Sequence, residues 1–569
     1  MRKPQTKGTG PSHWDSEVRL LLWLATCVSV LSFLYYFRRG EVLLYGDAVA
    51  HINIARRVFD SKTPGLLQLG TVWLPLPHLL MIPFIVSMKM WRTGAGGSIP
   101  SMAAYVFGVI GIFRLTRNAL SSTAEPDPPA RIAAWIAAAV YAANPNLVYM
   151  QATAMGESLY LAFFIWAVGY LVEAVKSDPK ALLKCGLCLA AACLTRYDGW
   201  FLTIAITASV LMYSIWSEDP YHVRGMAVLK GRVPVAEKSG VLAHRGRLIR
   251  FLLIAATAPA LWLAYNGIVY RNPLEFENGP YSAKAIEKRS QSASNPGHPG
   301  SGSPGTAGLY FLKAAQDNMA ENQWLQREWI FVLLAAVISP FLTVPNNRKL
   351  SASAWPLAFL LIPIPFYALS IAYGGVPIFI PQWWPFTHYN SRYGLQMLPA
   401  FATAVALLIN FLLRRSWDRR FRAAFIFALL AIAAASYASV WLSTPITLAE
   451  ARVNMRTRNQ LERELAEWLE KSPPDATLLM YLGDHVGAVE RAGIPLSHTI
   501  NEGNHRVWKQ PTDPQGLWER ALANPRQYAD YVLAFDGDPV WQAVHDLHLR
   551  ELVEIHVTGQ ARAILYRAR

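Results

Sequence analysis

Long apolar runs separated by short polar connections make up the first three quarters of the chain. Most runs are close to 20 residues, the length of helix that crosses the hydrocarbon core of a bilayer. We expect eleven crossings, at 18–37, 99–117, 131–147, 157–175, 181–195, 199–216, 249–269, 328–344, 354–372, 394–413 and 423–442. The pattern therefore predicts an all-helical polytopic membrane module.

The apolar stretch PLPHLLMIPFIVSMKMW, at 75–91, is ambiguous because it is short and contains two prolines and a histidine near its start. It fits either a crossing or a segment that lies along the membrane surface. Charge bias decides between them, since Lys and Arg collect in cytoplasmic loops. If 75–91 does not cross and the N-terminus is cytoplasmic, the short outer loops contain only two basic residues, Arg196 and Arg392. We therefore expect 75–91 to lie along the outer surface.

The same assignment places most basic residues on the cytoplasmic side. They are Arg2, Lys3, Lys7, Arg19, Arg114, Arg117, Arg131, Lys176, Lys180, Lys184, Arg224, Lys230, Arg232, Lys238, Arg245, Arg247, Arg250, Arg348, Lys349, Arg414, Arg415, Arg419, Arg420 and Arg422. The outer side then contains two long loops, 38–98 and 270–327, and everything after the last crossing. The second loop includes SASNPGHPGSGSPGTAG, a Gly/Ser/Pro stretch that we expect to be a mobile loop.

The pattern changes near residue 445. NQLERELAEWLEKS places Leu461, Leu465 and Leu469 on one helical face, and short β-rich runs follow it: ATLLMYL, DYVLAF, LVEIHV and ARAILYR. We predict two domains, a membrane module over 1–445 and an external, soluble, small α/β domain over 446–569.

Composition supports a membrane protein, because 53% of the 569 residues are hydrophobic and 16% are charged, against about a quarter charged in soluble domains. The net charge of +15 follows from the loop pattern, so we expect no nucleic-acid partner. The four cysteines, Cys27, Cys185, Cys188 and Cys193, lie in apolar runs and are expected to be packing residues.

Asp47, in LLYGDAVAHINIARR, is the first candidate for chemistry, because it lies at the outer end of the first predicted crossing. One interpretation is a helix N-cap, with His51 one turn later and with Arg56 and Arg57 touching lipid headgroups. The other is a carboxylate that takes a proton from an acceptor hydroxyl. The sequence leaves both open.

Glu157 and the two outer arginines are the next candidates. Glu157 begins a predicted crossing, where an acid also suits the helix dipole. Arg196 has Asp198 nearby as a structural partner, yet both Arg196 and Arg392 are of the type that holds a phosphate through paired hydrogen bonds. Weaker candidates for substrate binding are His51, Asp198, Lys284, Lys288, His388 and Tyr389, with Arg289 and the aromatic loop residues Trp383, Trp384 and Phe386.

In order along the chain, YGDAVAHINIARRV, GTVWLPLPHLLMIPF, NPNLVYMQATAMGESLYLAFF, LTRYDGW, NPLEFENGPYSA and SRYGLQMLPAFA resemble landmarks of the GT-C superfamily of membrane glycosyltransferases. The resemblance covers residues 18–445 and is nearest to the families of the protein O-mannosyltransferases and of the lipid A aminoarabinose transferase. It departs from the family pattern at Ala48, where many members have a second acid, and Glu157 is a candidate replacement. QWWPFTHYN has two tryptophans but not the Trp-Trp-Asp motif of oligosaccharyltransferases, so N-glycosylation is not expected.

The resemblance implies transfer of a sugar from a polyprenyl-phosphate donor to an acceptor hydroxyl on the outer face of the membrane, with inversion. Asp47 corresponds to the family's catalytic carboxylate and general base, and Arg196 or Arg392 would stabilise the leaving phosphate. We expect no cofactor and no metal, and a bacterial plasma membrane is the expected location. A transporter or a polysaccharide export protein is the alternative, although the chain shows neither an internal repeat nor charges at mid-helix.

Overall fold

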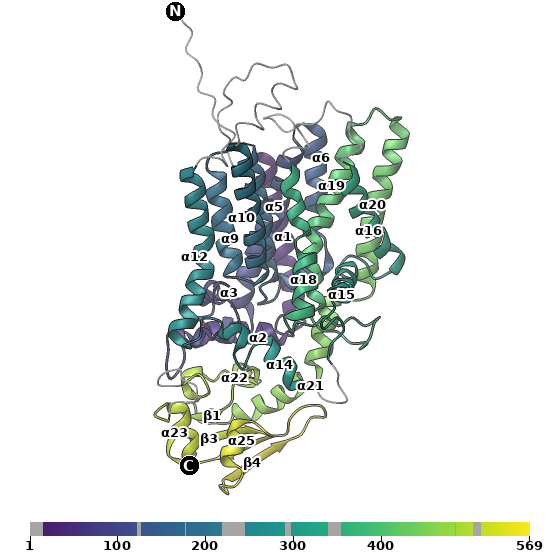
Figure 1. Ribbon diagram of the computed structural model, residues 1–569. Coiled ribbons are helices and arrows are strands. Elements are labelled where there is room, and N and C mark those ends of the chain that lie inside the picture. The colour runs from purple at the N-terminus through teal and green to yellow at the C-terminus, as the bar shows by residue number, and fades with distance from the viewer. Residues whose placement is uncertain are drawn as a thin grey trace, which may run out of the picture.

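A bundle of long helices with a small sheet at one end forms the molecule (Figure 1). The computed structural model describes residues 15–121, 127–176, 178–218, 245–290, 297–339, 354–483, 485–504 and 514–569. The long helices are α1 (Ser16–Arg38), α5 (Ala95–Leu120), α6 (Pro128–Ala142), α8 (Glu157–Val175), α9 (Ala181–Cys193), α10 (Asp198–Glu218), α12 (Arg245–Val269), α16 (Gln323–Ile338), α18 (Pro363–Tyr373), α19 (Leu398–Arg414) and α20 (Arg419–Leu442). The 3₁₀ segments η6 (Trp355–Leu361) and η7 (Ser391–Met397) lead into α18 and α19.

Each predicted crossing falls on one of these helices. Within the described residues, eight helical stretches are long and apolar enough to span a bilayer, and α6, α9 and α16 are shorter, with 15, 13 and 16 residues. Large apolar side chains such as Trp23, Leu31 and Phe427 are exposed on the outside of the bundle, as expected of a surface that faces lipid. The chain is an integral membrane protein with a mostly helical fold, as predicted.

The ambiguous stretch at 75–91 is not one helix. It forms three short pieces, α3 (Leu76–Met81), η2 (Ile82–Phe84) and α4 (Met88–Arg92), because proline removes a backbone donor and cannot continue a helix ladder. It is too broken to cross, in agreement with the prediction.

Arg56 fixes this segment to α2 (Gly46–Arg57), and its predicted contact with lipid headgroups is wrong. The guanidinium is buried: it donates to Ile85 O at 2.6 Å and to Val86 O at 2.9 Å, and it pairs with Asp60 at 2.7 Å.

The loop expected over the Gly/Ser/Pro stretch is partly helical. Residues 292–296 of that stretch lie outside the described residues, but α15 (Pro304–Asp317) begins within it. Ser303 caps the helix through its side chain and Pro304 occupies the first turn, where proline is favoured. Composition suggested a loop because glycine and proline are frequent in loops, but both residues are also found at helix starts.

The other short helices of the membrane part are η1 (Leu66–Leu69), α7 (Pro145–Met150), α13 (Glu275–Asn278) and α14 (Ala283–Ser290). The C-terminal part contains α21 (Ile446–Leu469), α22 (Val486–Ala492), η8 (Leu496–His498), α23 (Leu517–Ala523), α24 (Pro525–Tyr528) and α25 (Pro539–Val544). Its strands are β1 (Leu478–Met480), β2 (Thr499–Ile500), β3 (Tyr531–Phe535), β4 (Arg550–Ile555) and β5 (Ala563–Arg567).

The strands form one sheet in the order β2-β1-β3-β5-β4, in which β1 pairs in parallel with β2 and β3, and β5 pairs antiparallel with β3 and β4. A small α/β fold is therefore confirmed for this part, and all four predicted strands are present. β2, with two residues, was too short to show in the sequence pattern.

Helices α6 and α19 reach the end of the bundle opposite the sheet (Figure 1), and basic residues predicted to be cytoplasmic form ion pairs at their ends. Arg117 pairs with Asp15 at 2.5 Å and Arg131 pairs with Glu17 at 3.0 Å, next to the start of α1. Arg414 pairs with Asp127 at 2.7 Å. Several basic residues of the topology prediction lie outside the described residues: Arg2, Lys3, Lys7, Arg224, Lys230, Arg232, Lys238, Arg348 and Lys349.

Candidate active site

Arg392, in η7, connects three carboxylates from three distant parts of the chain. Its Nη2 lies 2.5 Å from Asp47 Oδ2, its Nε lies 3.1 Å from Glu157 Oε1, and its Nη1 lies 2.8 Å from Glu450 Oε1. The arginine is 6% exposed. A buried guanidinium is tolerated because all three of its nitrogens donate to charged acceptors.

Arg196 extends the same network. Its Nη1 lies 3.1 Å from Glu157 Oε1, so one carboxylate oxygen joins both arginines. Its Nε lies 3.4 Å from Asp198, the structural partner suggested by the sequence, and its Nη2 donates to the Tyr367 hydroxyl at 3.0 Å. The hydroxyl in turn donates to Asp198 at 2.7 Å.

Two tyrosine rings pack against the guanidinium groups. Tyr393 lies 4.8 Å from the Arg196 guanidinium and 5.1 Å from that of Arg392, and Tyr45 lies 5.1 Å from the latter. Cation–π contacts of this kind stabilise a desolvated positive charge. The sequence-predicted trio of Asp47, Arg196 and Arg392 is therefore joined in one cluster at the end of the bundle that lies next to the sheet.

Asp47 is the accessible acid of this cluster. Its side chain is 39% exposed, whereas the side chains of Glu157 and Glu450 are 1% exposed. The N-cap interpretation of Asp47 is wrong, because α2 begins at Gly46 and Tyr45 is the capping position. Asp47 instead lies in the first turn and uses its side chain to bind Arg392.

His51 lies one turn after Asp47 and belongs to the same surroundings. Its Nδ1 is 2.8 Å from His78 Nε2, and its ring packs against Trp73. Burial lowers the pKa of both histidines, although the nearby Asp47 and Glu157 carboxylates oppose this at His51. With both imidazoles neutral, one of these two nitrogens carries the proton and donates it to the other.

The weaker candidates divide into two groups. Tyr389 has Asp47 and Arg392 among its electrostatic neighbours, and burial lowers the pKa of His388, which faces Glu450. Both therefore adjoin the cluster. Lys284 instead pairs with Glu277, and Lys288 is exposed on the same short helix α14. Within the described part of the chain, no contact joins either lysine to the cluster.

Glu450, in α21, is the member of the cluster that sequence reasoning missed. It accepts from the backbone N–H groups of Asn390 and Ser391, at 3.1 and 2.7 Å, in addition to Arg392. It was assigned to the external domain and was not considered for the site. A signal was present, because ITLAEARV places an acid between apolar residues of an amphipathic helix, where an unpaired charge is costly.

The cluster offers one type of chemistry directly. Four carboxylates (Asp47, Glu157, Asp198 and Glu450) outnumber the two guanidinium groups, and both arginines are engaged by carboxylates. As arranged, the cluster presents a fixed, accessible carboxylate rather than an open anion site. Such a carboxylate is suited to accept a proton from a bound hydroxyl.

Comparison with known proteins gives matches of two kinds. Residues 75–231 match the family model of the dolichyl-phosphate-mannose-protein mannosyltransferases. The structure of ArnT from Cupriavidus metallidurans bound to undecaprenyl phosphate has a TM-score of 0.55 and 13% sequence identity, covering 97% of this chain and 98% of that chain. The apo state of the same protein gives a TM-score of 0.54, with 12% identity and coverage of 97% and 99%. Comparison with curated protein sequences gave no match.

These matches define the fold: over nearly its whole length this chain has the fold of ArnT. The fold and the family-model match over residues 75–231 agree with the resemblance seen in the motifs.

Proposed function

We propose that this chain is a glycosyltransferase that moves a sugar from a polyprenyl-phosphate donor to an acceptor hydroxyl, with Asp47 as the general base. The observation that carries the proposal is the geometry of Asp47: an accessible carboxylate held at 2.5 Å by a buried arginine. The match to mannosyltransferases, and a similar fold whose crystal structure contains undecaprenyl phosphate, support the donor class.

In the proposed reaction the acceptor oxygen attacks the anomeric carbon as the bond to the phosphate oxygen breaks. Asp47 takes the hydroxyl proton, and the lipid phosphate leaves with the bonding electron pair. A single displacement of this kind inverts the anomeric centre. Because Arg392 binds Oδ2, we assign the proton to the other oxygen, Oδ1.

For the leaving phosphate we favour Arg196 over Arg392. The Arg196 side chain is 17% exposed and that of Arg392 is 7% exposed, and Arg392 is bound by three carboxylates. Donor binding would exchange the long 3.4 Å contact of Arg196 with Asp198 for a bidentate contact with phosphate. Arg392 and Glu157 then act as positioning residues.

The domain boundary at residue 445 and the external location of the site remain predictions. The proposed function assumes both. The charge bias of the loops supports the external location, because the cluster lies at the end of the bundle opposite Arg117, Arg131 and Arg414. The sugar donor is then a lipid of the outer leaflet, and the acceptor is a glycan, lipid or protein of the cell envelope. The proposal includes the expectation that the reaction needs no metal, so transfer should persist in excess EDTA.

The test compares Asp47→Asn with Asp475→Asn, which changes an exposed acid of the C-terminal part. Each variant is returned to cells that lack the gene, and their lipids and glycans are compared by mass spectrometry. Asp47→Asn should remove the sugar-modified product, since loss of a general base costs about 10²–10⁴-fold in rate, and Asp475→Asn should restore it. Normal product with Asp47→Asn at normal protein levels contradicts the proposal.

Donor binding is tested separately with undecaprenyl phosphate and the purified full chain. Arg196→Ala should weaken binding by about tenfold or more, whereas Asp47→Asn should leave it nearly unchanged. Unaltered affinity in Arg196→Ala would refute the assignment of Arg196.

A further inference from the structure

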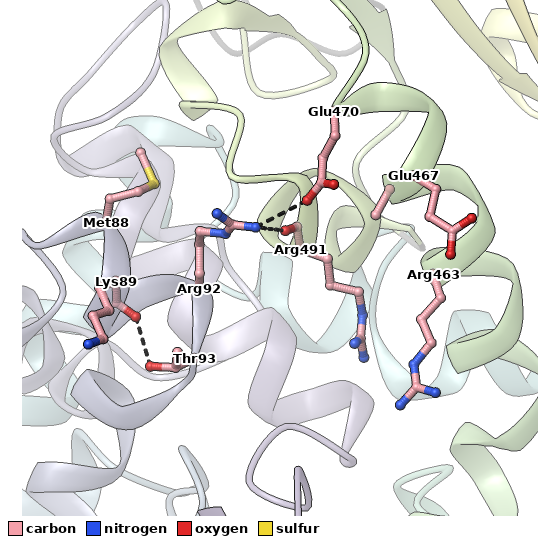
Figure 2. A pocket seen from close by; sticks show the side chains of 9 residues that line it. Met88, Lys89, Arg92, Thr93, Arg463, Glu467, Glu470 and Arg491 are labelled. Carbon is pink, nitrogen blue, oxygen red and sulfur yellow. Dashed lines mark hydrogen bonds and ion pairs between the residues drawn. The ribbon is translucent and has the colours of Figure 1, made fainter.

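A cavity of about 700 Å³ lies between the interfacial helix α4 and the helices α21 and α22 (Figure 2). Its volume is within the range of small-ligand sites, and no residue of the Asp47 cluster lines it. Four cations and two carboxylates face it: Lys89, Arg92, Arg463, Arg491, Glu467 and Glu470. The cavity therefore has more positive than negative charge.

Two of the four cations are held by the protein. Arg92 lies 3.3 Å from Glu470 and also donates to the Arg491 carbonyl. Arg491 donates to Asn459 Oδ1 at 2.6 Å, and its Nε lies 3.7 Å from the Glu462 carboxylate. These contacts fix both guanidinium groups at the wall of the cavity.

The other two cations, Lys89 and Arg463, have no carboxylate partner among the described residues. Arg463 and Glu467 are one helical turn apart on α21, a spacing that permits an ion pair, but within the described chain they form none. In Figure 2 the guanidinium groups of Arg463 and Arg491 extend to the same side, and Lys89 lies across the cavity on α4. An ammonium and a guanidinium that face one cavity without carboxylate partners are suited to an oxyanion.

The cavity lies at the level of lipid headgroups. Arg92 and Thr93 directly precede α5, which begins at Ala95 and is long and apolar enough to span the bilayer. Earlier in the same interfacial segment, Phe84 and Val86 are 39% and 63% exposed. Exposed apolar side chains followed by basic ones are typical of a segment that rests on an anionic bilayer. The oxyanion found at that depth is the phosphate of a phospholipid.

We propose that this cavity binds the phosphate of an anionic phospholipid, with Lys89 and Arg463 as its contacts from opposite walls. A choline or ethanolamine headgroup would bring its own cation among the four cations of the cavity, whereas a glycerol headgroup keeps the net negative charge. The ligand class is therefore phosphatidylglycerol-like. A phosphate between Lys89 and Arg463 connects the interfacial segment to α21, and this binding does not depend on the proposed sugar transfer.

Binding is measured on the purified full chain in detergent with dihexanoyl phosphatidylglycerol, dihexanoyl phosphatidylcholine and soluble glycerol 3-phosphate. The glycerol lipid should bind about tenfold more tightly than the choline lipid, the size of one hydrogen bond to a charged group. It should also bind more tightly than glycerol 3-phosphate, which lacks acyl chains to lie against the exposed Phe84 and Val86.

Variants of the unpaired charges test the contacts. Lys89→Gln and Arg463→Gln should each weaken binding of the glycerol lipid several-fold, and they break no ion pair within the described chain. Glu467→Gln removes a carboxylate from the cavity wall and should strengthen binding, a result that misfolding cannot produce. The matched control is Arg456→Gln, which changes an exposed arginine two turns earlier on α21 that does not line the cavity and should leave binding unchanged.

Three results would overturn the proposal. Equal affinity of the unaltered chain for the glycerol and choline lipids removes the anionic selectivity, and this measurement does not depend on whether any variant folds. An Arg463→Gln chain that binds as tightly as Arg456→Gln removes the phosphate contact. Glycerol 3-phosphate that binds as tightly as the glycerol lipid removes the membrane lipid as the ligand.

Discussion

At the scale of single residues, Glu450 fixes the position of Arg392. It accepts from two backbone N–H groups, from the Ser391 hydroxyl at 2.5 Å and from the Arg392 guanidinium at 2.8 Å, all in a buried environment. Replacing it by Gln removes the charge that neutralises part of Arg392. We expect Glu450→Gln to lower the free energy of unfolding by about 3–5 kcal/mol, the cost of breaking a buried ion pair.

Thermal unfolding of the detergent-solubilised chain measures this effect. The matched control is Glu464→Gln on the same helix, whose contact is a surface hydrogen bond to Gln460; it should change stability by less than about 0.5 kcal/mol. Equal melting temperatures for the two variants would contradict the positioning role of Glu450.

The buried carboxyl of Glu490 should make the free energy of unfolding depend on pH. Burial raises the pKa of its carboxyl to about 8, with Glu462 also raising it and Asn53 and Arg491 opposing. The folded chain therefore keeps this proton up to about pH 8, whereas the unfolded chain releases it near the ordinary value of 4.5. Because the folded state binds more protons over that range, stability falls as pH rises from 4.5 to 8.

Glu490→Gln removes this titration, so the loss of stability between pH 5 and pH 8 should be smaller than in the unaltered chain. Chemical denaturation at several pH values measures it. A variant with the same pH dependence as the unaltered chain would show that Glu490 does not titrate as inferred.

The sequence was sufficient to name Asp47, Glu157, Arg196 and Arg392, because charges in otherwise apolar outer loops are conspicuous. It could not show that one oxygen of Glu157 binds both arginines, nor that Glu450 completes the cluster. Those contacts join residues between 39 and 235 positions apart, beyond the reach of a local sequence pattern. Lys284 and Lys288 were equally conspicuous as charges, yet α14 places them with Glu277 and in solvent.

At the scale of elements, Arg56 attaches the interfacial segment to α2, the helix that carries Asp47. It donates to two carbonyls of that segment and stacks on Trp91 at 5.0 Å. Arg56→Met keeps the apolar stem but leaves two carbonyls and the Asp60 carboxylate without their partner. We expect the free energy of unfolding to fall by about 3–5 kcal/mol, because a buried ion pair is broken.

Adding Asp60→Asn to Arg56→Met should recover part of the lost stability. The Asn side chain still offers an oxygen to Ser497 N, which Asp60 binds at 2.9 Å, and it removes the uncompensated charge. The recovery is read from the difference in unfolding free energy between the single and double variants. A double variant less stable than the single one would show that the charge is not the cause.

Elements were easier to predict than contacts because their signals are local. All eleven apolar runs correspond to helices, and the prolines of 75–91 correctly indicated a broken segment. The start of α15 was missed because Ser303 and Pro304 occur both in loops and at helix N-termini. Whether this segment forms a loop or a helix start depends on its packing against α18 and η7. A single sequence does not reveal that packing.

At the scale of the whole molecule, the Asp47 cluster lies where the membrane part meets the C-terminal part. Helix α21 supplies Glu450 to the cluster, and α2 supplies Asp47 to it and Asn53 to a hydrogen bond with the buried Glu490 of α22. A change at the interface of α2, α21 and α22 would therefore act on the cluster. This interface lies at one end of the bundle, so its side of the membrane decides where the proposed chemistry takes place.

Single cysteines measure that side. In a chain with Ser at the four native cysteine positions (Cys27, Cys185, Cys188 and Cys193), Asp475→Cys and Ser416→Cys each place an exposed thiol at one end of the bundle. If the basic loops are cytoplasmic, a membrane-impermeant maleimide should label Asp475→Cys in intact spheroplasts and should label Ser416→Cys only after lysis. The reverse pattern would place the Asp47 cluster in the cytoplasm, where a donor lipid of the outer leaflet does not reach it. Labelling of both thiols in intact cells would contradict the bundle's topology itself.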